Sequence, residues 1–161
     1  MSDFEDLASN VVASLTQRGL TLALAESCTG GLIGSLLTDV PGSSASFLGA
    51  IVPYSNVSKE VLLGVPKDTM VRHGSVSAES ALAMAHGVRE RFGADIGVGV
   101  TGITGPGGGT AEKPVGLVHI AAVGPDATVM QKRFVWDGGR VENKRHSAKA
   151  ALELVLELAQ R

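Results

Sequence analysis

A serine, a cysteine and a threonine stand side by side in the segment Glu26-Ser27-Cys28-Thr29-Gly30-Gly31. The segment follows a short apolar run and precedes a helical pattern, so its backbone N–H groups belong to a helix start. Such groups attract anions and stabilise developing negative charge. The segment could therefore hold a phosphate, or a nucleophile beside an oxyanion site. The alternative is that Ser27 or Thr29 only caps the helix, as these residue types commonly do. A P-loop is excluded because its Gly-Lys-Ser/Thr ending is absent.

A lysine, Lys59, follows Tyr54-Ser55-Asn56 and falls in the first turn of another predicted helix. A cation is unfavourable there because it opposes the helix dipole. A lysine whose pKa falls by burial from about 10.4 to about 7–8 can accept a proton from a serine hydroxyl. Serine–lysine pairs are a known alternative to Ser-His-Asp catalysis. The ordinary alternative is a solvated lysine on the surface.

The segment from Thr101 to Thr110 contains five glycines in ten residues. A turn needs one or two glycines, and five indicate a backbone that lies against a ligand with its amides exposed. A flexible surface loop is the alternative. Lys113, which follows, is expected to be a solvated charge.

Arg140 begins the last predicted helix, directly after Asp137-Gly138-Gly139. This is again an unfavourable helix end for a cation, and a phosphate-bearing ligand would compensate for it. The alternative is an exposed arginine paired with Asp137 or Glu142, a contact that contributes little to stability.

Cys28 is the single cysteine, which excludes an intrachain disulfide and a cysteine-rich metal site. A thiol at a helix start can act as a nucleophile, whereas a small buried side chain is the ordinary alternative. The four histidines lack a metal-ligand spacing such as His-Glu-x-x-His. We therefore expect no metal and no cofactor.

The elements that would position these residues follow from the pattern of apolar side chains. The pattern predicts strands over residues 20–25, 47–54, 96–100, 117–123 and 128–136. It predicts helices over residues 4–18, 32–40, 55–63, 77–91 and 140–159, with a short one after Pro66.

Helices separate the first three strands, so these strands are expected to run parallel with helices on both faces. Pro53 cannot donate to a central ladder and places the second strand at an edge. The short link over residues 124–127 makes the last two strands an antiparallel hairpin. We therefore predict a three-layer α/β/α fold with a five-stranded mixed sheet of order 2-1-3-4-5, strand 5 being antiparallel. Ligands of such sheets bind at the carboxyl ends of strands 1 and 3, where both glycine segments emerge.

The composition agrees with one domain over residues 1–161. The net charge is −2, and no basic tract of five or more residues suggests a nucleic-acid partner. No apolar run reaches membrane-spanning length, and the acidic start of the chain is unlike a signal peptide. We therefore expect a soluble, cytoplasmic protein with no nucleic-acid or membrane partner.

These segments together resemble the CinA C-terminal domain family, whose stand-alone members are nicotinamide-nucleotide amidohydrolases. The resemblance spans nearly the whole chain, in order, and its motifs are long and unusual. It is carried by residues 25–31, Pro41-Gly42-Ser43-Ser44, Tyr54-Ser55-Asn56 with Lys59, residues 74–77, 101–109 and 113–116, and Arg140.

The resemblance implies a metal-free hydrolysis of the carboxamide of nicotinamide mononucleotide, which gives nicotinate mononucleotide and ammonia. It implies Ser27 as the nucleophile and Lys59 as its base, with Tyr54 beside them. It also implies a five-stranded mixed sheet in three layers, and a homodimer or higher homo-oligomer.

The substrate-binding positions implied by the resemblance are Ser44, Thr104 and Arg140. Gly139 stands where the family commonly has an aspartate before the arginine. In the mechanism that we predict, the backbone amides of the turn (Cys28, Thr29, Gly30 and Gly31), together with the segment at Thr104 and Gly105, face the substrate.

Two other functions are compatible with the same residues. A non-catalytic nucleotide-binding or regulatory module needs only the glycine segments and Arg140. A hydrolase acting on a related nucleotide amide needs the same serine–lysine pair.

Overall fold

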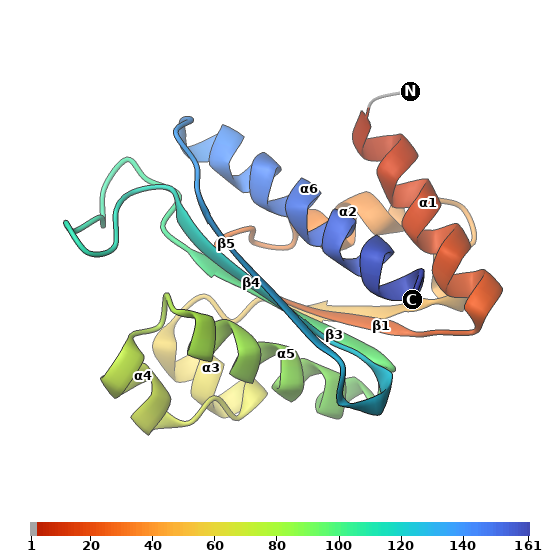
Figure 1. Cartoon of the computed structure of the whole chain (residues 1–161), viewed down its shortest axis with the longest axis horizontal. Helices are drawn as coiled ribbons and strands as arrows, with labels where there is room; N and C mark the ends of the chain where they lie inside the picture. The colour runs from red at the N-terminus through yellow and green to blue at the C-terminus, as the bar shows by residue number, and fades with distance from the viewer. Residues whose placement is uncertain (1–2) are drawn as a thin grey trace.

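The computed structural model describes residues 3–161, in which a five-stranded sheet lies between two layers of helices (Figure 1). The strands are β1 (Leu22–Glu26), β2 (Phe47–Ile51), β3 (Ile96–Gly102), β4 (Leu117–Val123) and β5 (Val129–Val135). The helices are α1 (Asp3–Arg18), α2 (Leu32–Thr38), α3 (Asn56–Leu63), α4 (Lys67–His73), α5 (Ala78–Phe92) and α6 (Arg140–Ala159), with short 3₁₀ turns at Ser43–Ala45 and Pro125–Ala127.

The strand order is β2-β1-β3-β4-β5, which confirms the predicted order. β1 pairs with β2 and β3 in parallel, and β4 and β5 form the predicted antiparallel hairpin. The direction of the fourth strand was predicted wrongly. β4 runs antiparallel to β3, so β4 is the reversed strand and β5 returns to the direction of β1–β3. The reason is that residues 103–116 contain no helix, and a parallel connection usually needs one.

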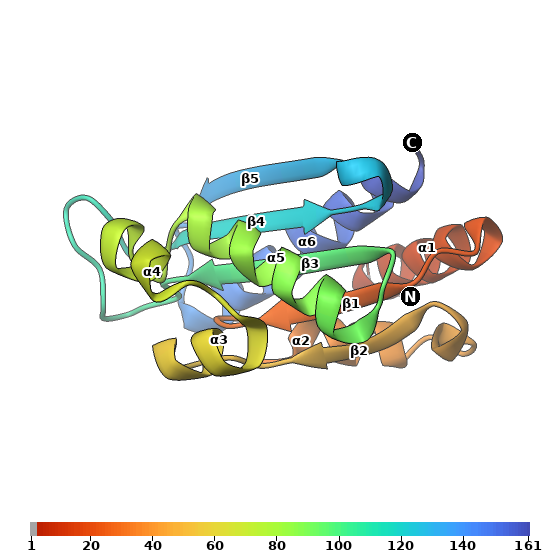
Figure 2. The ribbon, with the colours of Figure 1, turned by 90° about the horizontal axis from the view of Figure 1, so that it is seen from below.

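Helices α1, α2 and α6 cover one face of the sheet, and α3, α4 and α5 cover the other (Figures 1 and 2). The larger apolar core lies beneath the first group, where α6 contributes small and branched side chains such as Ala148, Leu152 and Val155. Burial of these apolar side chains contributes most of the driving force for folding. Both ends of α6 agree with the predicted helix over residues 140–159.

On the other face, α5 packs directly on the backbone of β3. A Cβ added at Gly97 would lie 2.2 Å from the carbonyl oxygen of Ala85, and one at Gly99 would lie 2.3 Å from that of Ala81. Gly87, on α5 itself, meets the backbone of α3 in the same way, because a Cβ there would lie 2.0 Å from the carbonyl oxygen of Leu63. Three glycines therefore bring β3, α5 and α3 together without intervening side chains.

β2 ends at Ile51, three residues before the predicted end of the strand. Pro53 follows within the chain and has no N–H to donate, and the N–H of Tyr54 donates to the carbonyl of Val52 at 3.1 Å. The chain therefore turns away from the sheet immediately before α3. Among the helices of residues 3–161, none has both the length and the apolar character needed to cross a membrane.

Candidate active site

A cavity of about 240 Å³ lies at the carboxyl ends of β1 and β3, the edge at which the strand order predicts a ligand site. Its walls are formed by Ser27 and Cys28 after β1, by Tyr54, Asn56 and Lys59 at α3, by Ser75 and Val76 between α4 and α5, by residues 101–105, 107 and 108, and by Arg140. Five separate parts of the chain thus meet here.

Ser27 and Lys59 lie in contact inside this cavity. Lys59 Nζ donates to Ser27 Oγ at 3.2 Å, and both residues are buried, with exposed fractions of 3% for Lys59 and 6% for Ser27. The same Nζ donates to the backbone carbonyl of Tyr54 at 3.4 Å. Ser55 caps α3 by accepting from the N–H of Ser58 at 3.1 Å, which fixes the first turn of the helix that carries the lysine.

The surroundings of Lys59 favour its neutral form. Burial lowers its pKa below the ordinary value of 10.5, an effect that exceeds the opposing one of Cys28. Within residues 3–161, no carboxylate forms an ion pair with Lys59 that would stabilise its charge. A neutral amine against a serine hydroxyl is the arrangement of a general base beside a nucleophile.

The side chain of Glu26, which is fully buried, holds the turn that carries Ser27. Its carboxylate accepts from Thr29 Oγ1 at 2.8 Å and from the N–H groups of Ile33 and Gly34 at 2.8 and 2.9 Å. These N–H groups belong to the first turn of α2, where a carboxylate is favourable. Glu26 therefore serves the role that a helix cap would serve, and it leaves Ser27 free to face Lys59.

Thr29, Gly30 and Gly31 of the same turn do not line the cavity. Gly30 and Gly31 have φ values of +63° and +100°, which favour glycine, and the N–H of Gly30 donates to the carbonyl of Ser27. Thr29 Oγ1 is engaged by Glu26. Of the predicted residues of this turn, only Ser27 and Cys28 line the cavity.

Backbone amides are nevertheless available to a ligand. Among the described residues, the N–H groups of Thr104 and Gly105 donate to no group of the chain, whereas the N–H of Cys28 lies against its own thiol; all three residues line the cavity. Unpaired N–H groups beside a nucleophile are the donors that stabilise an oxyanion. Of the predicted donors, the second glycine segment therefore presents the free N–H groups to the cavity.

Arg140 contacts two parts of the cavity wall, Gly105 and Tyr54. Its Nη1 donates to the carbonyl of Gly105 at 2.7 Å, and its Nη2 donates to the phenolic oxygen of Tyr54 at 3.1 Å. The side chain of Tyr54 is largely exposed, so this contact lies toward the mouth of the cavity. The guanidinium is therefore placed where an incoming anion would meet it.

Asn143 was not predicted, although it organises the same region. Its side chain is fully buried, and Nδ2 donates to the carbonyls of Thr104 and Gly138 at 3.0 and 2.9 Å. Its Oδ1 accepts from the N–H of Gly138 at 3.0 Å. Asn143 thus ties the second glycine segment to the turn that precedes Arg140. The signal in the sequence is an amide at an inward-facing position of an otherwise alanine- and leucine-lined helix face.

Ser44 is not brought to the cavity. It lies exposed in the 3₁₀ turn before β2, at the amino end of that strand. The cavity lies at the opposite, carboxyl end of the sheet. The structure thus unites Ser27, Lys59, Tyr54, Cys28, Thr104, Gly105 and Arg140 and leaves Ser44 apart.

Cys28 is buried, and desolvation raises the pKa of its thiol from 9.0 to about 12. A thiolate is required for nucleophilic attack, so the cysteine is poorly suited to that role. We predict that Cys28→Ser retains kcat/KM within about threefold, and that iodoacetamide at about pH 8 leaves the parent protein active. Inactivation by the reagent that Cys28→Ser resists would contradict this prediction.

No group of three or more histidine, cysteine, aspartate or glutamate side chains that could hold a metal ion occurs in the described part of the chain. The ionisable groups of the cavity are the lysine, the arginine, the thiol and the phenol.

Comparison with known proteins places this arrangement in context. Residues 4–159 match the CinA C-terminal domain. The CinA-like proteins of Chlorobaculum tepidum and Gloeobacter violaceus are 55% and 49% identical to the chain, over 91% and 96% of its length. In both cases the chain spans 36% of the length of the relative.

Solved structures of similar length share the fold. The competence/damage inducible protein CihA from Agrobacterium tumefaciens is 43% identical, with a TM-score of 0.95, over 100% of this chain and 98% of that one. A CinA superfamily protein from Klebsiella pneumoniae is 27% identical, with a TM-score of 0.94, over 99% of both chains.

Proposed function

Because the chain belongs to the CinA C-terminal domain family and holds a serine against a buried lysine, we propose that it hydrolyses nicotinamide mononucleotide to nicotinate mononucleotide and ammonia. The observation that carries the proposal is the 3.2 Å contact between Lys59 Nζ and Ser27 Oγ, in a cavity lined by no aspartate or glutamate of the described residues. The family resemblance supports the choice of substrate, and the contact between Ser27 and Lys59 supports the type of reaction.

In the proposed mechanism, neutral Lys59 takes the proton of Ser27 while Ser27 Oγ forms a bond to the carboxamide carbon. The amides of Thr104 and Gly105 stabilise the resulting oxyanion, and losing one such donor typically costs about 10²–10³ in rate. Lys59 then returns the proton to the amide nitrogen, the C–N bond breaks, and ammonia leaves. Water, activated by Lys59, hydrolyses the acyl ester and restores the Ser27 hydroxyl.

Arg140 and the amides of Gly107 and Gly108, farther along the second glycine segment, bind the phosphate of the ribose. The guanidinium already lies at the mouth of the cavity, between Tyr54 and Gly105. Binding of a remote phosphate orients the carboxamide toward Ser27, and this contributes to catalysis rather than only to affinity.

The decisive experiment measures ammonia release from nicotinamide mononucleotide by purified, chelator-treated protein. We expect turnover without added metal, and a far lower kcat/KM for free nicotinamide, which lacks the phosphate. Equal turnover of the two compounds would contradict the phosphate contact. Binding of the mononucleotide with no release of ammonia would favour the nucleotide-binding module instead, and release only from other nucleotide amides would identify a different substrate.

We also propose that the chain works in the cytoplasm and, from the family resemblance, that it forms a homodimer or higher homo-oligomer. Light scattering on the purified protein tests the assembly, since a monomer has a mass of 16.5 kDa. A mass of one chain at all concentrations would contradict it.

A further inference from the structure

The connection between β3 and β4 forms part of the cavity wall although it has no helix or strand of its own. Residues 103–116 leave the carboxyl edge of the sheet and extend beyond it in Figures 1 and 2. Thr104, Gly105, Gly107 and Gly108 line the cavity. A connection without helix or strand has no regular hydrogen-bond ladder, so its position depends on individual contacts.

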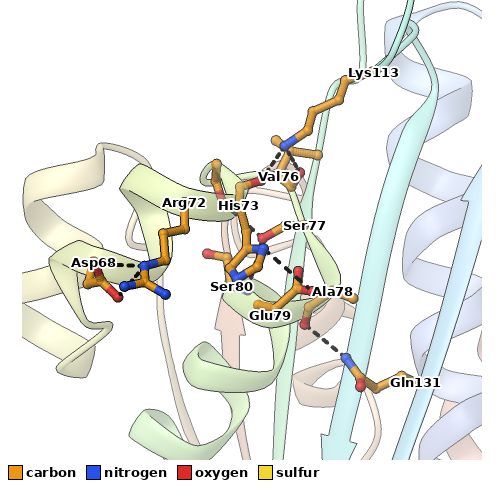
Figure 3. Close-up of polar contacts among 11 residues, drawn as sticks. Asp68, Arg72, His73, Val76, Ser77, Ala78, Glu79, Ser80, Lys113 and Gln131 are labelled. Carbon is orange, nitrogen blue, oxygen red and sulfur yellow. Dashed lines mark hydrogen bonds and ion pairs between the residues drawn. The ribbon is translucent and has the colours of Figure 1, made fainter.

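One such restraint is the side chain of Lys113, which crosses from this connection to the segment between α4 and α5. Lys113 Nζ donates to the carbonyls of His73, at the end of α4, and Val76, the latter at 2.8 Å (Figure 3). Val76 and its neighbour Ser75 line the cavity as well. The lysine was expected to be a solvated charge, but its Nζ joins two parts of the cavity wall.

The other end of Lys113 is fixed to the glycine-rich connection. Its N–H donates to Thr110 Oγ1 at 3.0 Å, and the N–H of Thr110 donates to the carbonyl of Lys113 at 2.7 Å. The lysine therefore forms a continuous link from the connection to the α4–α5 segment, with hydrogen bonds at both ends.

The structure also makes room for this Nζ. Gly74 has a φ of +84°, and a Cβ at this position would lie 2.5 Å from Lys113 Nζ. Over residues 3–161, no carboxylate forms an ion pair with Lys113, so the two carbonyls are its polar partners. Carbonyls at the end of a helix are favourable partners for a cation.

We propose that Lys113 is a positioning residue, which holds the glycine-rich connection against the α4–α5 segment and so sets the shape of the substrate-binding wall. It acts through the backbone of its partners and does not contact Ser27 or Lys59. The kinetic part of its test rests on the proposed function, whereas the structural part does not.

The test compares Lys113→Met, which keeps the apolar stem and removes the ammonium, with Lys132→Met on β5 as a matched control. Lys132 is exposed and pairs with Glu157, away from the cavity. For Lys113→Met we expect KM for nicotinamide mononucleotide to rise about tenfold and kcat to change by less than about twofold. We also expect exchange of the Thr110 N–H, which donates to the carbonyl of residue 113, to quicken about tenfold, with Tm unchanged. The control should alter none of these quantities.

Gly74→Ala approaches the same contact from the other side, because its methyl group would displace Lys113 Nζ, and it also strains the backbone at a φ of +84°. The double variant then measures coupling. We expect the double variant to raise KM and the exchange rate of the Thr110 N–H by less than the product of the two single-variant factors. A KM and a Thr110 N–H exchange rate equal to those of the parent in Lys113→Met would overturn the inference, as would a fall of kcat and Tm together in that variant.

The two proposals fail in different ways. If the parent protein releases no ammonia from the mononucleotide, the proposed function fails, and hydrogen exchange alone decides the role of Lys113. Faster exchange of the Thr110 N–H in Lys113→Met would support the role, and exchange equal to that of the parent would overturn it.

Discussion

Replacing Ser27 by alanine is expected to lower kcat for ammonia release by about 10⁴-fold or more, because Ser27 is the hydroxyl of the cavity that Lys59 Nζ contacts. Cys28 stands beside it, but burial raises the pKa of its thiol to about 12. Affinity for nicotinamide mononucleotide should persist, since Arg140 and the glycine-rich segment are untouched. Steady-state kinetics and calorimetric titration of the variant measure the two quantities separately.

Ser35→Ala is the matched control for this prediction. Ser35 is exposed on α2, the helix that follows the Ser27 turn, and its hydroxyl is outside the cavity. The control should retain the activity of the parent. Ammonia release by Ser27→Ala at the rate of the control would show that the serine is not the nucleophile and would refute the serine–lysine mechanism.

Replacing Lys59 by methionine is expected to lower kcat by about 10³–10⁴-fold, the upper range for removal of a general base. The same change should raise Tm, because it replaces a buried amine that no carboxylate neutralises with an apolar side chain. Activity and stability thus move in opposite directions, which a generally disruptive substitution would not produce. Lys67→Met, at the exposed start of α4, is the control and should change neither quantity.

The pH dependence of this gain in stability follows from the sign of the pKa shift. The pKa of Lys59 in the folded chain lies below the value of 10.5 expected when unfolded, so the unfolded chain binds the proton more tightly. The free energy of unfolding of the parent therefore rises with pH between these two pKa values. The advantage of Lys59→Met should be greatest below the folded-state pKa and should vanish above about pH 10.5. An advantage that grew with pH would contradict the assignment.

The fold could be predicted from the sequence where local pattern and connection length are sufficient. The limits of α6 and β4 follow from apolar periodicity, and the edge position of β2 follows from Pro53. The direction of β4 was predicted wrongly because strand 5 was expected to be the reversed strand of the hairpin, whereas β4 is the reversed one. Residues 103–116 carry glycines and prolines rather than a helical pattern, and a helix-free connection returns the chain antiparallel to β3.

The site was predictable in its location but not in its distances. Carboxyl ends of parallel strands meet at one edge, and this brings the Ser27 turn, Tyr54 and the Thr104 segment together. The contact between Ser27 and Lys59 depends on how α3 packs, which is a tertiary property. Ser44 precedes β2, so its distance from the cavity could have been deduced from the strand direction alone. Asn143 and Lys113 were missed because their partners are backbone carbonyls far away in the chain.

The three glycines that join β3, α5 and α3 determine how the Ser27–Lys59 separation responds to change. Lys59 belongs to α3, and Gly87 and Gly99 let main chain rest on main chain between that helix and the sheet. No side chain lies between the main chains at these contacts, so exchange of a side chain cannot change the spacing there directly. Apolar side chains around these contacts can therefore be exchanged without directly changing the distance between Ser27 and Lys59. A methyl group at any of the three glycines would instead push the neighbouring main chains apart.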